Sequence, residues 1–147
     1  MTTIKSFTSL EQSKKLAKIL SLESADMHYH YDIDFDELEA IPTITEEDDH
    51  FILFPNDVRC WSLAALIHLL PSKFTKKGNC SETTYNIDIR KYALTEDTNI
   101  YQIAYGNYKF YEDGNSSWKD IINTSEKENL IDVAFEMICW LKENNVL

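Results

Sequence analysis

The twelve residues ADMHYHYDIDFD, at positions 25–36, decide the fold class of this chain. Apolar or aromatic side chains occupy every second position, and histidines or aspartates occupy the positions between them. Alternation with a period of two is typical of a strand that is buried on one face. We therefore predict a strand here that turns its tyrosines toward the core and its imidazoles and carboxylates toward solvent.

The sequence on both sides of this strand predicts further helices and strands. Upstream, a capping-box pattern at 8–11 and apolar residues at helical spacing predict a helix at 9–21. Downstream, an apolar stretch that ends at Pro71 predicts a buried helix beginning near residue 58, in which His68 would be a core histidine. The other predicted segments are an acidic connection at 38–49, a short apolar run at 51–54, a basic loop at 72–83, strands at 85–90, 100–105 and 108–113 with a turn at Gly106 and Asn107, and a helix at 126–144.

This order of elements predicts an α+β fold. We expect one antiparallel sheet of four to five strands with about three helices. The second and C-terminal helices should be largely buried, because they are apolar on nearly all sides. A chain of 147 residues with 44% hydrophobic content can form a real core, and its composition marks no linker. We therefore predict a single domain over residues 1–147.

Cysteine usage and hydropathy predict a cytoplasmic protein. The three cysteines, Cys60, Cys80 and Cys139, are an odd set without a C-x-x-C pair, which argues against a disulfide scaffold. The N-terminal sequence lacks the apolar core of a signal peptide. The longest apolar run, at 60–70, is shorter than the roughly 20 residues that span a bilayer. We expect no membrane association.

Negative charge is concentrated in one part of the sequence. The formal net charge is −11 at pH 7, and residues 19–58 contain twelve Asp and Glu residues but no Lys or Arg. This charge argues against nucleic acid as a partner and favours a basic protein surface, which an acidic segment at 23–49 would attract. The residues that we predict to bind this partner are Asp32, Asp34, Asp36, Glu37, Glu46, Glu47, Asp48 and Asp49.

The same strand contains a candidate metal site. On a strand, His28, His30, Asp32 and Asp34 would point to one face, with alternate residues roughly 6.5–7 Å apart. Two imidazoles spaced in this way can reach one Zn²⁺ or Mn²⁺ ion, and a carboxylate can complete the set. His50 offers a third nitrogen ligand. The competing interpretation is an ordinary solvated face of an acidic strand.

Other catalytic and cofactor motifs are missing from the sequence. The calcium-loop spacing fails, because Glu37 stands where glycine is needed and Thr43 where the bidentate Glu is needed. There is no G-x-S-x-G motif, and three glycines are too few for a phosphate-binding loop. We name no catalytic residue and expect no cofactor other than a divalent metal ion.

Two segments carry a resemblance. WSLAALIHLLP at 61–71 resembles the WSLxALLxLLP stretch of small, uncharacterised acidic proteins of gut anaerobes and their phages or mobile elements. NLIDVAFEMI at 129–138 is similar to the NPxDAxxEMIxxL helix of the same proteins. The resemblance implies two core helices and an origin in a mobile element. It implies no activity and no functional residue, because that group has none assigned.

Two functional hypotheses remain open. The first is a non-enzymatic protein-binding or inhibitory accessory module that uses the acidic segment at 23–49. The second is a metal-dependent hydrolase with a His-x-His-x-Asp site at His28, His30 and Asp32, assisted by His50 or Asp34. The oligomeric state is not indicated by the sequence.

Overall fold

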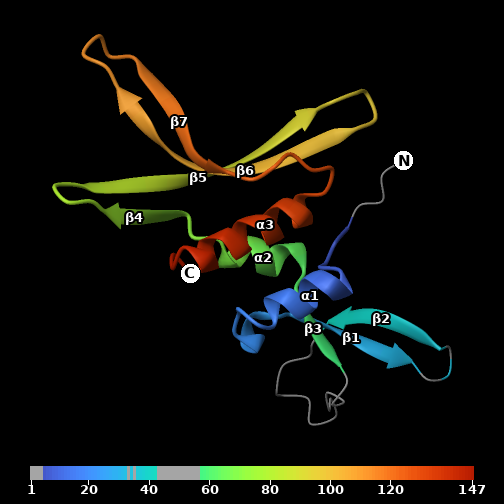
Figure 1. The fold of residues 1–147 in the computed structure, drawn as a ribbon. Helices are drawn as coiled ribbons and strands as arrows, with labels where there is room; N and C mark the ends of the chain where they lie inside the picture. Colours follow the sequence, from blue (N-terminus) through green and yellow to red (C-terminus); the bar gives the residue numbers. More distant parts are fainter. Residues whose placement is uncertain (1–4, 33, 35, 43–56) are drawn as a thin grey trace. The chain divides into compact units, whose positions relative to one another are not determined.

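The protein is described by a computed structural model covering residues 5–32, 34, 36–42 and 57–147 (Figure 1). The described residues form three α-helices and two antiparallel sheets, of three and four strands, so the α+β prediction is confirmed. The chain divides into two compact units, an N-terminal unit at 5–69 and a C-terminal unit at 70–147. The single domain expected from the sequence stays a prediction.

The N-terminal unit contains a three-stranded sheet in the order β2-β1-β3, with both pairs antiparallel. Its elements are α1 (Leu10–Leu16), a 3₁₀ turn (Leu22–Ser24), β1 (Met27–Asp32), β2 (Glu37–Pro42), β3 (Val58–Cys60) and α2 (Leu63–Leu69).

Helix α1 begins with a capping box one residue later than predicted. Ser9 accepts a hydrogen bond from the Gln12 backbone, and the Gln12 side chain accepts one from the Ser9 backbone. The predicted cap, Thr8, is fully buried instead, and its hydroxyl accepts the Trp61 backbone N–H at 3.1 Å. Thr8 therefore joins α1 to the segment after β3 and does not cap the helix. The helix ends at Leu16, earlier than predicted.

The segment at 58–60 is a strand, although the sequence predicted a helix from there. It pairs with β1, and a strand partner overrides weak local helix preference. Helix α2 starts only at Leu63, after Ser62, whose hydroxyl accepts the Ala65 backbone N–H at 3.1 Å. Leu66 is its buried residue, whereas His68 is exposed, so the prediction of a core histidine was wrong.

The two faces of β1 are not assigned as the sequence predicted. His28 is fully buried, while Tyr31 is 50% exposed. Tyr29 contacts the N-terminal segment: its hydroxyl donates to the Thr8 carbonyl at 2.7 Å, and its ring packs edge-to-face on Phe7. Alternation shows which side chains share a face, but it does not show which face another element covers. The prediction of solvent-facing imidazoles was therefore wrong at His28.

The predicted acidic strand and connection are a hairpin in the structure. Strand β1 ends at Asp32, and Asp36 has a positive φ of 52° in the turn. Strand β2 then returns alongside β1 from Glu37, in the part of the chain where the sequence predicted an irregular connection. The short apolar run at 51–54 lies outside the described residues.

The C-terminal unit is a four-stranded antiparallel sheet in the order β4-β5-β6-β7, with a long helix packed on β6 (Figure 1). The buried core joins Ile103 and Tyr105 of β6 to six residues of the helix. Burying an aliphatic side chain contributes about 1.5–3 kcal/mol, so this one layer stabilises the unit substantially. The elements are β4 (Lys73–Lys77), β5 (Glu82–Ala93), β6 (Asn99–Phe110), β7 (Ser116–Asn123) and α3 (Leu130–Glu143).

Gly106 does not form the predicted turn. Strand β6 continues through it with a bulge between Tyr105 and Gly106. A Cβ atom on Gly106 would lie 2.3 Å from the Lys119 carbonyl oxygen and 2.8 Å from the Trp118 ring. The glycine is thus needed for close approach of β7 and not for a positive φ. The real turns flank β6, and the predicted basic loop contains the edge strand β4.

Candidate metal centre

Strand β1 brings His28 and His30 to one face. They are separated by one residue in a regular strand, which places both side chains on the same side of the sheet. Their ring centroids are 6.5 Å apart, and the rings are nearly perpendicular, at 80°. This part of the predicted site is present in the structure.

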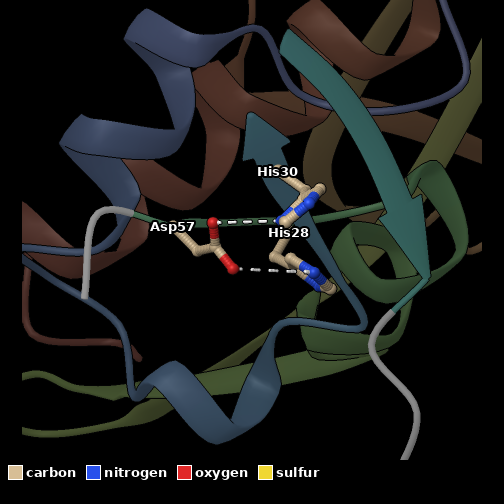
Figure 2. A group of neighbouring side chains, drawn as sticks. All are labelled: His28, His30 and Asp57. Atoms are coloured by element: carbon tan, nitrogen blue, oxygen red, sulfur yellow. Dashed lines mark ion pairs between the residues drawn. The ribbon is translucent and has the colours of Figure 1, made fainter. Parts of the chain in front are cut away.

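The third member is Asp57, the residue immediately before β3 (Figure 2). In the antiparallel β1–β3 pair, His28 lies opposite Arg59 and Tyr29 opposite Val58. Continuing this register by one residue sets Asp57 opposite His30, and directly opposite side chains project to the same face. The Asp57 carboxylate lies 4.0 Å from Nε2 of His28 and 3.5 Å from Nδ1 of His30.

These spacings suit ligands around one ion. One ligand atom from each of the three residues lies within 4.8 Å of the other two. Ligands held about 2.1 Å from a tetrahedral ion stand about 3.4 Å apart, whereas a good N–H···O hydrogen bond is about 2.7–3.2 Å long. The distances from the Asp57 carboxylate to both imidazoles are thus close to the distance between two ligands of one ion.

Burial and the positive charge of Arg59 favour the neutral form of His28. The side chains of His28 and Asp57 are 0% and 5% exposed, and that of His30 is 31% exposed. Burial lowers the pKa of His28, the Asp57 carboxylate opposes this shift, and the positive charge of Arg59 adds to it. A lowered pKa favours neutral imidazole, which is the form that binds a metal. The site opens toward solvent at His30.

Among the described side chains, Asp34 does not join this group. Asp34 is exposed in the hairpin turn, and His50 lies outside the described residues, as does the side chain of Asp32. Asp57 was not among the ligands predicted from the sequence. One signal was available, because Asp57 directly precedes a short run that is apolar at alternate residues, Val58 and Cys60, and that can pair with β1.

The predicted partner-binding residues are only partly described. Asp34, Asp36 and Glu37 are exposed on the β1–β2 hairpin, and the Tyr31 hydroxyl donates a hydrogen bond to the Asp36 carboxylate. Asp32 belongs to β1, and only its backbone is described. The remaining members, Glu46, Glu47, Asp48 and Asp49, lie outside the described residues.

No family model matches this chain, and neither the curated proteins nor the solved structures gave a match. Across the described part of the chain, every helix is too short or too polar to cross a lipid bilayer. The function therefore has to be argued from the geometry.

Proposed function

We propose that the protein is a metal-dependent hydrolase whose divalent ion is bound by His28, His30 and Asp57. The observation that carries this proposal is the convergence, within 4.8 Å, of two imidazoles from β1 and one carboxylate from the residue before β3. Two nitrogen ligands and one oxygen ligand suit Zn²⁺, Mn²⁺ or Fe²⁺. Three protein ligands leave at least one coordination position for water, as in catalytic sites.

A metal ion bound here would supply a nucleophile at neutral pH. Coordination lowers the pKa of water from 15.7 to about 7, which yields metal-bound hydroxide. Water activated in this way would form a bond to the phosphorus or carbonyl carbon of an ester while the ester bond to the alcohol oxygen breaks, and the proton lost by the water would pass to the leaving alkoxide. Partial exposure of His30 gives the substrate an approach. Arg59, paired with His28 across the strands, places a positive charge beside the site, which favours an anionic ester.

Metal analysis tests the site directly. Protein purified without an affinity tag, incubated with Zn²⁺ or Mn²⁺ and desalted, should retain about one equivalent of metal. His30→Ala and Asp57→Asn should each weaken binding by at least about 100-fold, because each removes a ligand. His68→Ala is the matched control, since it removes an exposed histidine from α2. Equal loss in His68→Ala, or no retained metal in the unaltered protein, contradicts the proposal.

Activity tests the reaction class. Release of p-nitrophenolate from p-nitrophenyl phosphate and from its diester should require the added metal and should stop with a chelator. Asp57→Asn should reduce the metal-dependent rate by at least about 100-fold, whereas His68→Ala should leave it unchanged. A protein that binds metal stoichiometrically but accelerates neither reaction has the metal centre without this hydrolytic role.

A second candidate function is supported by the exposed acidic hairpin. Asp34, Asp36 and Glu37 are exposed on the β1–β2 hairpin, and the neighbouring Glu39 is exposed as well. The stretch at 19–58 contains no Lys or Arg. We propose that this hairpin binds a basic surface on another protein, with encounter accelerated by charge, as an accessory or inhibitory module would.

Salt dependence tests this second candidate. A partner captured at low ionic strength should be released at about 0.5 M salt, where the Debye length is only a few ångströms. The triple change Asp34→Asn, Asp36→Asn and Glu37→Gln should slow association by about tenfold or more. The matched control, Glu96→Gln with Asp97→Asn, neutralises two exposed acids of the C-terminal unit. Capture that is equally strong at both salt concentrations counts against the hairpin.

We further propose a cytoplasmic location, with neither nucleic acid nor membrane as a partner. Its support is the cysteine content: the three cysteines, all of them described, form no disulfide, and Cys80 is exposed. Exposed free thiols are typical of reducing compartments. The low pI of about 4.7 supports the exclusion of nucleic acid.

A further inference from the structure

The C-terminal unit contains a cavity of about 380 Å³ that is separate from the candidate metal centre. Its volume lies within the range of small-molecule sites, about 300–1,000 Å³. It is bordered by strands β4, β5 and β7, the end of α3 and the turn that follows α3. Aromatic rings from three elements line it, namely Phe74, Tyr85 and Trp140.

The part of the lining around Phe74 is fixed by ring packing within the protein. The Phe74 ring lies 5.2 Å from the Tyr85 ring and 5.0 Å from the Tyr105 ring, measured between centroids. Tyr105 is fully buried, and its hydroxyl donates to the Pro71 carbonyl at 2.6 Å. Packed aromatic rings lose little further freedom on binding, so this wall is pre-organised for a flat apolar group.

Another part of the lining is fixed by the C-terminal turn of α3. Asn145 has a positive φ of 56°, its N–H bonds to the Lys142 carbonyl at 3.1 Å, and the Val146 N–H bonds to the Leu141 carbonyl at 2.8 Å. This pair of bonds is a Schellman motif, which folds the chain back after a helix. It brings Asn145 and Val146 to the cavity beside Trp140.

The charged side chains in the described lining of the cavity are all positive. Among the described residues, Lys76 and Lys77 are the charged ones that line the cavity, and none of the lining residues is acidic, although the chain carries a net charge of −11. Lys77 pairs with Glu82 at 3.6 Å. Lys76 lies on the same face of β4 as Phe74, and it has no ion pair with any residue that the structure describes. Two lysines therefore border an aromatic cavity, and one of them, Lys77, is paired with an acid.

We propose that this cavity binds a small carboxylate with an aromatic body. The ring would lie against Phe74 and Trp140, and the carboxylate would pair with the Lys76 ammonium group. Charge complementarity selects the anion, and the aromatic walls select a flat apolar body. The site depends on neither the metal centre nor the acidic hairpin.

The test compares 3-phenylpropionate with its neutral amide, 3-phenylpropionamide, on the full chain. Titrations followed by ¹H–¹⁵N NMR should move the Trp140 indole signal saturably, with a dissociation constant on the order of 0.1–1 mM for the carboxylate. The amide should bind about fivefold more weakly, because an exposed ion pair contributes modestly. Lys76→Gln should remove this difference. Lys73→Gln, on the same strand but outside the cavity lining, should preserve it.

Three results overturn the proposal. The first is the absence of a saturable shift at Trp140 with either compound, and the second is equal affinity for carboxylate and amide in the unaltered protein. The third is an equal effect of Lys73→Gln and Lys76→Gln, which would show general attraction to a basic strand. Lys76 is exposed, so its replacement should not unfold the protein, and the dispersion of the NMR spectrum verifies this.

Discussion

Hydrogen bonds from Arg90 and Trp118 favour the ionised form of Asp120. Its carboxylate accepts two hydrogen bonds from the Arg90 guanidinium, one of them at 2.7 Å, and one from the Trp118 indole at 2.6 Å. These bonds, those from Arg90 foremost, lower the pKa of Asp120 to about 2. Asp120 therefore stabilises the fold fully above about pH 4, where it is also ionised in the unfolded chain.

This contribution should disappear as the pH falls from about 4 to about 2. We expect the loss to be about 1–2 kcal/mol in the free energy of unfolding, because the pair is partly exposed and is screened. Asp120→Asn should be less stable by that amount at pH 6 and should lose less stability on acidification. Urea unfolding at pH 6, 3 and 2 measures both effects. Asp97→Asn, on an exposed turn, is the control, and parallel pH curves for Asp120→Asn and the unaltered protein contradict the assignment.

Individual residues also show how much of the candidate site could be predicted from the sequence. His28 and His30 were predicted to share a face, and they do, because that follows from strand periodicity alone. Asp57 was missed because it joins them through long-range pairing of β1 with β3. Gly106 was interpreted as a turn residue because the sequence does not show that the Trp118 ring packs over it. Tertiary contacts decide both cases.

Helix α3 ends in a turn that depends on the backbone conformation of Asn145. Asn145 occupies the left-handed region that residues with a Cβ rarely adopt, and Asn and Gly tolerate it best. Asn145→Ala should therefore destabilise the protein by about 1 kcal/mol, while Asn145→Gly should be neutral or slightly stabilising. Urea unfolding monitored by far-UV circular dichroism measures both. Equal destabilisation by Ala and Gly would show that the Asn side chain matters, and not its backbone conformation.

Elements with strong local patterns were predictable, and those set by pairing were not. Strand β5 and helix α3 follow their alternation and helical spacing, although α3 starts at Leu130, later than predicted. Residues 126–129, which were predicted to begin this helix, are not helical. Ser125 donates backbone and side-chain hydrogen bonds to the Glu136 carboxylate, at 2.8 and 2.7 Å. Strands β2, β3 and β4 have weak patterns of their own, and their partners in the sheets determine them.

The two compact units can unfold together or one at a time. A unit of about 60 residues buries only about 60% of its unfolded surface and is marginal alone, whereas about 100–150 residues is the usual size of one domain. We therefore expect residues 5–69 and 70–147 to unfold in one cooperative transition. Leu16 and Ile138 are fully buried residues of the two units and allow a paired test.

Leu16→Ala and Ile138→Ala should each lower the free energy of unfolding by about 2–5 kcal/mol, because each leaves a cavity in a packed core. In a cooperative molecule, either change accelerates hydrogen exchange of the slowest amides by the same factor in both units. Hydrogen exchange with mass spectrometry measures this factor for peptides of each unit. Leu94→Ala, at a side chain that is 63% exposed, should change neither. Acceleration confined to residues 5–69 in Leu16→Ala would contradict cooperative unfolding. It would mean that the N-terminal unit opens while the C-terminal sheet stays folded.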